Sequence, residues 1–107
     1  MPVRAVQFRS RAVEDLDAAV GHLVDEGRRD VAVTLVDAVE AATNHLAKSP
    51  NSGSIRFAYE LGIPDLRAWP LRRWPYVIFY LGHGDRIDVL RILHTTRDIP
   101  STLADDA

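Results

Sequence analysis

Apolar side chains recur at helical spacing in the first half of the chain. Positions i, i+3, i+4 and i+7 are apolar from residue 16, which predicts an amphipathic helix. This stripe consists of Leu16, Ala19, Val20 and Leu23. Ser10 is the expected N-cap, Glu14 and Asp15 are expected near the positive end of the helix dipole, and Gly27 is expected to end the helix.

A second helix follows the same pattern. We expect Asp30 to cap it and the turn-forming segment from Ser49 to Gly53 to stop it. Its apolar stripe consists of Ala32, Leu35, Val36, Val39, Ala42 and Leu46. The first half of the chain therefore predicts a helical hairpin.

The rest of the pattern is typical of β-strands. Val3–Arg9 predicts a strand before the hairpin, and Ile55–Tyr59 predicts another after it. Strands are also expected within Leu66–Tyr80 and over Ile87–His94, with Gly82–Asp85 as the turn between them. The predicted order is β-α-α-β-β-β, an α+β fold in which a helical hairpin packs on a mainly antiparallel four-stranded sheet. Residues 1–107 are expected to form a single domain, with Ser101–Ala107 as a short polar tail.

Two helices can cover only one face of such a sheet. Alternation along the last strand would place Ile87, Val89, Arg91 and Leu93 on one face. The opposite face is then expected to expose apolar area rimmed by arginines, a composition typical of a protein-binding surface.

Charge is distributed unevenly along the chain. The formal net charge is −2, from 13 Lys+Arg and 15 Asp+Glu. Between Ala12 and Ala47 there are eight acidic and two basic residues, whereas Leu66–Arg97 holds six arginines and two aspartates. The basic half predicts an anionic partner, while the acidic helices would repel nucleic acid, so direct nucleic-acid binding is not expected.

Several classes of site have no support in the sequence. There is no cysteine, and the four histidines lack metal-ligand spacing, so we expect neither a metal nor a cofactor. No apolar run approaches the length of a membrane span, and the N-terminus lacks the apolar core of a signal peptide. A cytoplasmic protein without membrane contact is therefore expected.

The order of elements and two motifs resemble the ParE branch of the RelE/ParE toxin superfamily of toxin–antitoxin modules. The motifs are the strand Pro75–Tyr80 and the ending Arg91–Pro100, and the resemblance runs from Val3 to Leu103. It implies a toxin of the kind involved in plasmid stabilisation, which inhibits DNA gyrase by binding and is neutralised by a ParD-like antitoxin. On this interpretation His94 and Arg97 contact the target. The antitoxin's acidic, apolar C-terminal segment would bind Arg67, Arg72, Arg91 and Phe79.

The sister branch of the superfamily suggests an alternative, a ribosome-dependent mRNA endonuclease. Its catalytic residues would be Arg91, His94 and Arg97. Val77 occupies the position where such nucleases place a phosphate-holding arginine, which favours the non-enzymatic interpretation. A third alternative is a member of the superfamily that binds an antitoxin-like partner without poisoning a target.

Overall fold

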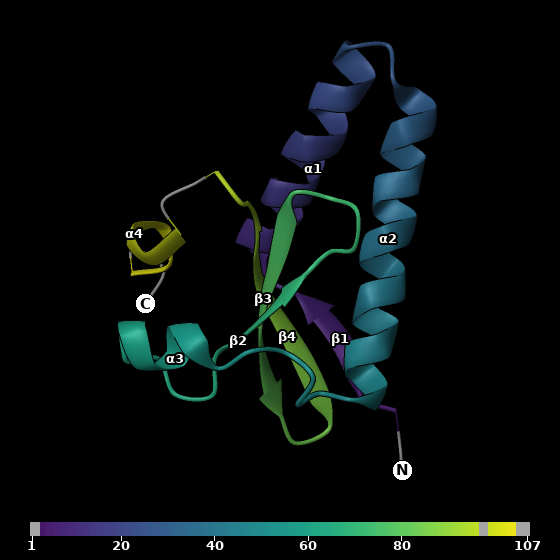
Figure 1. The fold of residues 1–107 in the computed structure, drawn as a ribbon. Helices are drawn as coiled ribbons and strands as arrows, with labels where there is room; N and C mark the ends of the chain where they lie inside the picture. The colour runs from purple at the N-terminus through teal and green to yellow at the C-terminus, as the bar shows by residue number, and fades with distance from the viewer. Residues whose placement is uncertain (1–2, 97–98, 105–107) are drawn as a thin grey trace.

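The computed structural model describes residues 3–96 and 99–104, which form an α+β fold (Figure 1). In chain order, strand β1 (Ala5–Phe8) is followed by helices α1 (Ser10–Asp25), α2 (Arg29–Lys48) and α3 (Arg56–Leu61). Strands β2 (Arg67–Pro70), β3 (Tyr76–His83) and β4 (Arg86–His94) and helix α4 (Ile99–Ala104) complete the chain. The predicted fold class is confirmed, with two short helices added.

The four strands form one sheet in the order β1-β4-β3-β2. The β4 strand lies inside the sheet, parallel to β1 and antiparallel to β3, and β2 is antiparallel to β3. The turn between β3 and β4 is tighter than predicted, because the strands continue to His83 and resume at Arg86. Gly84 adopts a φ of +54° there, a conformation that glycine reaches without strain.

The hairpin of α1 and α2 packs against one face of the sheet and projects beyond its end (Figure 1). The predicted stripes point into this core, except that Val36 is exposed on α2. Gly27 follows the end of α1 with φ +75°, as predicted. The predicted caps were wrong: Arg9 and Arg28 occupy the N-cap positions without side-chain capping bonds, and Asp30 lies in the first turn of α2.

The prediction of a strand over Ile55–Tyr59 was wrong, because Arg56–Leu61 forms helix α3. Phe57, Ala58 and Leu61 pack toward the sheet, a helical spacing of i, i+1 and i+4. Gly62 ends the helix in the left-handed conformation, with φ +64°. The helix has an apolar face that a strand of the same residues would have divided between two sides.

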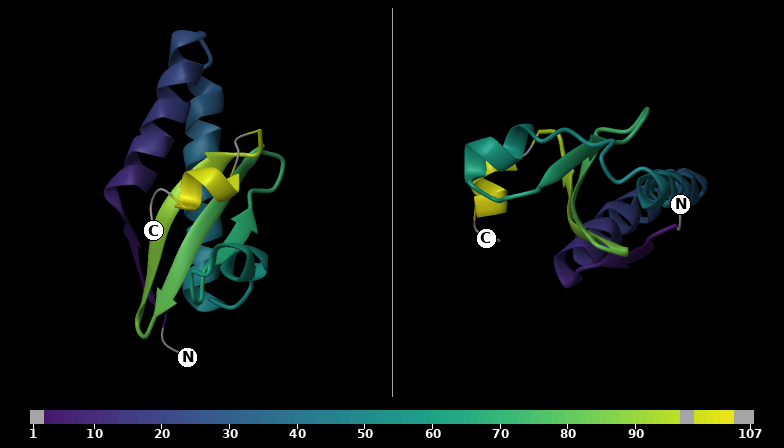
Figure 2. Two further views of the ribbon diagram at one scale, coloured as in Figure 1. Left: turned by 90° about the vertical axis from the view of Figure 1, so that its left-hand side faces the viewer. Right: turned by 90° about the horizontal axis from the view of Figure 1, so that it is seen from below.

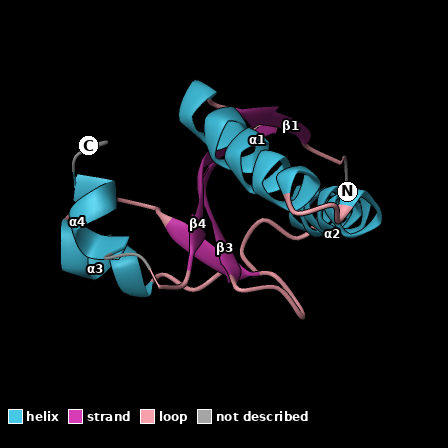
Figure 3. Cartoon of the chain, turned by 90° about the horizontal axis from the view of Figure 1, so that it is seen from above, coloured by secondary structure: helices cyan, strands magenta, loops and turns pink. Residues whose placement is uncertain are grey.

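The second face of the sheet is also covered, so the predicted exposed apolar face does not exist within the described residues. Figure 2 and Figure 3 show α3 and α4 on the opposite side of the sheet from the α1–α2 hairpin. The predicted polar tail is partly helical, since Leu103 of α4 is fully buried in this second core. The core on this face comprises Leu66, Ala68, Val77, Phe79, Leu93 and Leu103.

Strict alternation along β4 was also a wrong prediction. Phe79 pairs with Arg91 but the next residue, Tyr80, pairs with Val89, so β4 contains a bulge at Leu90. As a result Val89 packs under the hairpin while Leu93 packs under α3 and α4. Leu90 is an extra residue in β4, so the alternation of side chains between the two faces of the sheet is offset by one position after it.

Candidate functional site

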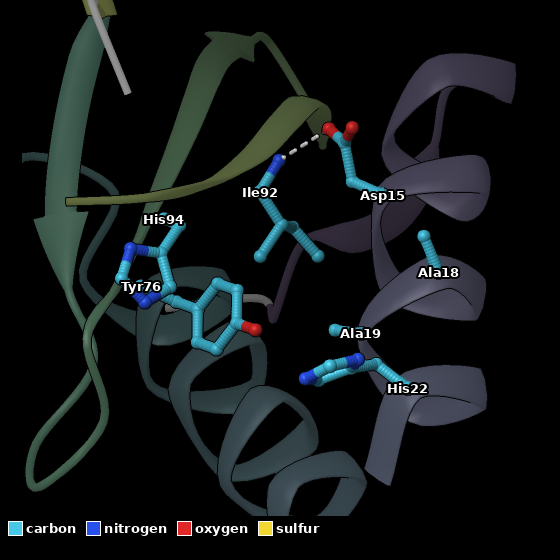
Figure 4. Close-up of a pocket in the computed structure, with 7 residues that line it drawn as sticks. All are labelled: Asp15, Ala18, Ala19, His22, Tyr76, Ile92 and His94. Carbon is cyan, nitrogen blue, oxygen red and sulfur yellow. Dashed lines mark hydrogen bonds between the residues drawn. The ribbon is translucent and has the colours of Figure 1, made fainter. Parts of the chain in front are cut away.

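A depression of about 210 Å³ lies where α1 meets the beginning of β3 and the end of β4 (Figure 4). Helix α1 contributes Asp15, Ala18, Ala19 and His22, and the strands contribute Tyr76, Ile92 and His94. Figure 4 shows the Tyr76 hydroxyl directed toward His22 and Ala19 across the depression. This is where the structure places His94, one of the two predicted target contacts.

His94 is held by two groups beside it. Its register partner on β3 is Tyr76, and the two rings meet edge to face with centroids 5.2 Å apart. The backbone N–H of Thr96 donates to His94 Nδ1 over 3.1 Å, and Thr96 Oγ1 lies 2.7 Å from the same nitrogen. Because Nδ1 accepts a hydrogen bond, the neutral ring is assigned its proton on Nε2. In this arrangement His94 offers a donor and is poorly placed to act as a general base.

Arg91 points toward α1 and not toward a free surface. Its Nε and Nη2 donate to the two carboxylate oxygens of Asp15 over 2.8 and 2.9 Å. Both side chains are largely buried, with 8% and 10% of their areas exposed. Two parallel hydrogen bonds between charged groups make a strong, directional pair. Arg91 thus forms an internal ion pair and does not lie at the surface, where the sequence led us to expect it.

The remaining predicted contacts are dispersed. Arg67 Nη1 donates to the carbonyls of Asn51 and Gly53, over 3.1 and 2.8 Å, and so holds the loop between α2 and α3. Phe79 is fully buried against Phe57, with ring centroids 5.3 Å apart. A partner could reach Phe79 only if α3 moved.

Of the other two predicted contacts, Arg72 is exposed in the loop between β2 and β3. Arg97, predicted to contact the target, lies outside the described residues. The structure therefore places His94 in the depression that Asp15, the partner of Arg91, also lines, and it leaves Arg67, Arg72 and Phe79 elsewhere.

Tyr80 secures the same loop as Arg67 from inside the core. Its hydroxyl accepts from the Gly53 N–H over 2.9 Å and donates to the Pro50 carbonyl over 2.8 Å. Burial raises the pKa of the Tyr80 hydroxyl above its usual 10.0, while the hydrogen bond from Gly53 and the charge of Arg67 act in the opposite direction. A Cβ on Gly53 would lie 2.6 Å from the Tyr80 hydroxyl, so this position requires glycine.

Asp15, His22 and Tyr76 were missed as members of this site. From the sequence, Asp15 was given only a place near the positive end of the first helix dipole, although a signal for its role in the site existed. An arginine within an apolar strand needs a carboxylate partner when buried, and the acidic helices were the obvious source. No such signal existed for Tyr76 and His22, which become neighbours of His94 through strand register and helix packing.

The chain belongs to the ParE toxin family. The family model described as "ParE toxin of type II toxin-antitoxin system, parDE" matches residues 6–99. The fold is similar to a solved structure described as the chromosomal ParDE TA system from P. aeruginosa, with a TM-score of 0.70 and 23% identity over 86% of this chain and 96% of that chain. A comparison with curated proteins found no match. The chain is thus a ParE toxin of a type II toxin–antitoxin system.

In residues 3–96 and 99–104, no three His, Cys, Asp or Glu side chains gather as a metal ion would require. No helix of these same ranges has both the length and the apolar character needed to cross a bilayer.

Proposed function

We propose that this ParE-family chain acts in the cytoplasm by binding DNA gyrase and inhibiting it, and that a cognate ParD-like antitoxin neutralises it. Membership of the ParE family over residues 6–99 is the observation that carries the proposal. Three positions that an RNA-cleaving relative would use for catalysis also support the proposal. Arg91 is paired with Asp15, Nδ1 of His94 accepts from Thr96, and position 77 is a buried valine.

The gyrase contact is proposed at the depression around His94. Its lining combines the Nε2–H of His94 and the Tyr76 hydroxyl with the apolar side chains of Ala18, Ala19 and Ile92. Such a mixture suits insertion of a side chain from a protein partner, with polar groups fixing its orientation. Arg97, three residues after His94, remains part of the proposed contact.

The antitoxin is proposed to bind beside α3. A groove of about 460 Å³ there is lined by Ile55, Ala58, Tyr59, Gly62, Pro64, Asp65 and Arg67. Tyr59 is 80% exposed, and exposed aromatic side chains beside an apolar groove often anchor protein partners. The guanidinium of Arg67 donates hydrogen bonds to carbonyl oxygens, which carry no net charge. Its positive charge can therefore still attract an acidic segment. Arg72 would extend the contact, whereas Arg91 and Phe79 would be reached only after rearrangement.

One experiment separates inhibition of gyrase from RNA cleavage. Purified toxin is added to a gyrase supercoiling assay and, in parallel, to translating ribosomes with a defined mRNA. We expect supercoiling to fall and the mRNA to stay intact. Cleavage of the mRNA with normal supercoiling would establish the nuclease alternative, and no effect in either assay would favour a member that only binds a partner.

A second experiment tests the antitoxin groove. Tyr59→Ala is compared with the parent chain by calorimetric titration of the antitoxin, with Val33→Ala on α2 as an exposed apolar control. An anchoring aromatic contributes about 2 kcal/mol or more to binding, so the Tyr59 variant should lose at least that much. Equal affinities for both variants would show that the antitoxin binds elsewhere.

A further inference from the structure

Asp88 of β4 is a buried carboxylate on which three basic side chains converge, two arginines and a histidine. Arg9 Nη2 lies 3.4 Å from its Oδ2, His83 Nε2 lies 3.5 Å from the same oxygen, and Arg86 Nε lies 3.2 Å from Oδ1. Arg9 precedes α1, His83 ends β3 and Arg86 begins β4, so three separate parts of the chain meet here. We refer to Arg9, His83 and Arg86 as the Asp88 cluster.

The Asp88 cluster holds more positive charge than its carboxylate can neutralise. One aspartate balances a single guanidinium, yet two arginines and a histidine share it. The aspartate side chain is only 4% exposed, whereas Arg9, His83 and Arg86 are 53%, 47% and 52% exposed. Each arginine carries five N–H donors, more than the two oxygens of one carboxylate shared by three basic side chains can accept. Asp88 therefore acts as an internal anchor that keeps cationic groups close together at the surface.

The surroundings add further positive charge. Arg4 Nε donates to the carbonyl of Gly84, in the turn between His83 and Arg86, over 2.8 Å. The backbone N–H of Arg4 donates to Ala47, which places Lys48 at the same end of the molecule. Figure 1 shows the β3–β4 turn and the C-terminal end of α2 at this end. Asp85, exposed in the turn, is the acidic residue that opposes these cations.

We propose that the Asp88 cluster binds a phosphate group of a nucleic-acid backbone. Guanidinium groups held at short separation match the oxygens of a phosphate and donate several hydrogen bonds to them. The cluster contains no apolar side chain, whereas a docked peptide draws most of its binding energy from apolar anchors. Backbone phosphates are contacted by exposed arginine and lysine donors of this kind. This inference stands whether or not gyrase is the target. It places nucleic acid at the end of the molecule opposite the α1–α2 turn, where the acidic residues Asp25, Glu26 and Asp30 lie (Figure 1).

The test measures binding of a fluorescent duplex DNA of arbitrary sequence by anisotropy, at a series of salt concentrations. A few phosphate contacts give weak binding, with a dissociation constant on the order of 10⁻⁴ M or higher at physiological salt. Arg9→Gln and Arg86→Gln should each weaken binding and reduce the slope of log K against log salt by about 1. The matched controls are Arg73→Gln and Arg29→Gln, which remove the same charge at exposed positions in the β2–β3 loop and at the start of α2. The controls should leave the slope nearly unchanged.

Asp88→Asn separates a built site from a general effect of charge. This substitution raises the net charge by one, so a purely charge-driven interaction would strengthen. The proposal expects weaker binding, because the cations lose the group that holds them together. Thermal melting of each variant confirms that it is folded.

Four results would overturn the proposal. The first three are equal losses in the control arginine variants, stronger binding by Asp88→Asn, and no binding of DNA by the parent chain at low salt. Poly-glutamate is titrated in the same assay as a competing class of ligand. If Arg9→Gln and Arg86→Gln weakened poly-glutamate binding but not DNA binding, the site would belong to an acidic peptide instead.

Discussion

The Asp15 carboxylate binds Arg91, 76 positions further along the chain, and at the same time accepts the backbone N–H of Ile92 over 2.9 Å. Strand β1 ends at Phe8, opposite Val89, so beyond this point no strand among the described residues pairs with β4 on that side. The Asp15 carboxylate supplies the hydrogen-bond acceptor that a neighbouring strand would otherwise provide for the Ile92 N–H. One carboxylate thus satisfies a buried charge and an unpaired backbone donor next to the bulge.

Removing the Asp15 carboxylate should lower the stability of the folded chain substantially. Asp15→Asn removes the charge of the carboxylate that pairs with the buried guanidinium of Arg91, and we expect the free energy of unfolding to fall by about 3–5 kcal/mol. Urea denaturation measures the difference. Asp17→Asn, on the exposed side of the same helix, is the control and should stay within about 0.5 kcal/mol of the parent. The double variant Asp15→Leu with Arg91→Met should be more stable than Asp15→Asn, because no buried charge is left unpaired.

The Tyr80 hydroxyl predicts a loss of stability in alkali. Its pKa is raised in the folded chain above the unfolded value near 10.0, so the folded state holds this proton more tightly. The contribution is fully present below pH 10.0 and is lost as the pH rises through the folded pKa. Denaturant titrations at increasing pH should therefore show a steeper decline for the parent than for Tyr80→Phe. Parallel declines would contradict the raised pKa.

The same substitution should lower stability at neutral pH. Tyr80→Phe removes the acceptor for the Gly53 N–H and the donor to the Pro50 carbonyl, both within a buried site. Leaving such groups unsatisfied costs about 1–3 kcal/mol each. A change in the unfolding midpoint of urea titrations measures this loss, and an unchanged midpoint would mean that water replaces the hydroxyl.

Substitution of His94 is expected to reduce inhibition of the target more than it reduces the stability of the fold. Its ring is half-buried at the end of β4, so His94→Ala should change the melting temperature little while reducing gyrase inhibition. Arg97→Ala should act in the same direction. Asn44→Ala, exposed on α2, is the control. Growth arrest in cells that express the toxin without antitoxin is the second measurement. Full arrest by His94→Ala and Arg97→Ala would remove both residues from the proposed contact.

Helix α4 should contribute substantially to stability despite its length. Leu103 is fully buried between α4 and the sheet, and truncation to alanine leaves a cavity. Leu103→Ala should cost about 2–5 kcal/mol, whereas Val33→Ala, on an exposed position of α2, should cost little. Chemical denaturation compares the two. Equal stabilities would show that α4 is detached from the sheet in solution.

The sequence predicted the parts of the fold that local patterns determine. The helical stripes of α1 and α2 and the hairpin of β3 and β4 each follow from residues close together in the chain. Helix α3 escaped prediction because Ile55, Phe57 and Tyr59 alternate like a strand, and the left-handed Gly62 after Leu61 was the competing signal. The local pattern could not distinguish a strand from a helix in this segment, because packing of Phe57 against Phe79 favours the helix.

The site was harder to predict than the fold. His94 was identified from a family-like motif, but its neighbours Tyr76, His22 and Asp15 come from two other elements. The bulge at Leu90 changed which residues of β4 share a face, and a bulge leaves no reliable mark on a single sequence. Arginines expected at a surface were in part structural: Arg91 pairs with a helix and Arg67 holds a loop.

The parallel pairing of β1 with β4 also sets the order of events during synthesis. Strand β1 leaves the ribosome before the other three strands, yet its hydrogen-bonding partner β4 begins at Arg86, after the helical hairpin and β3. Closing so long a loop carries an entropic cost, and contacts between distant parts of a chain slow folding. The nascent chain can form its helical hairpin early, but the sheet closes only after β4 has been synthesised. A truncated or stalled product would lack the completed sheet and, with it, the surface around His94.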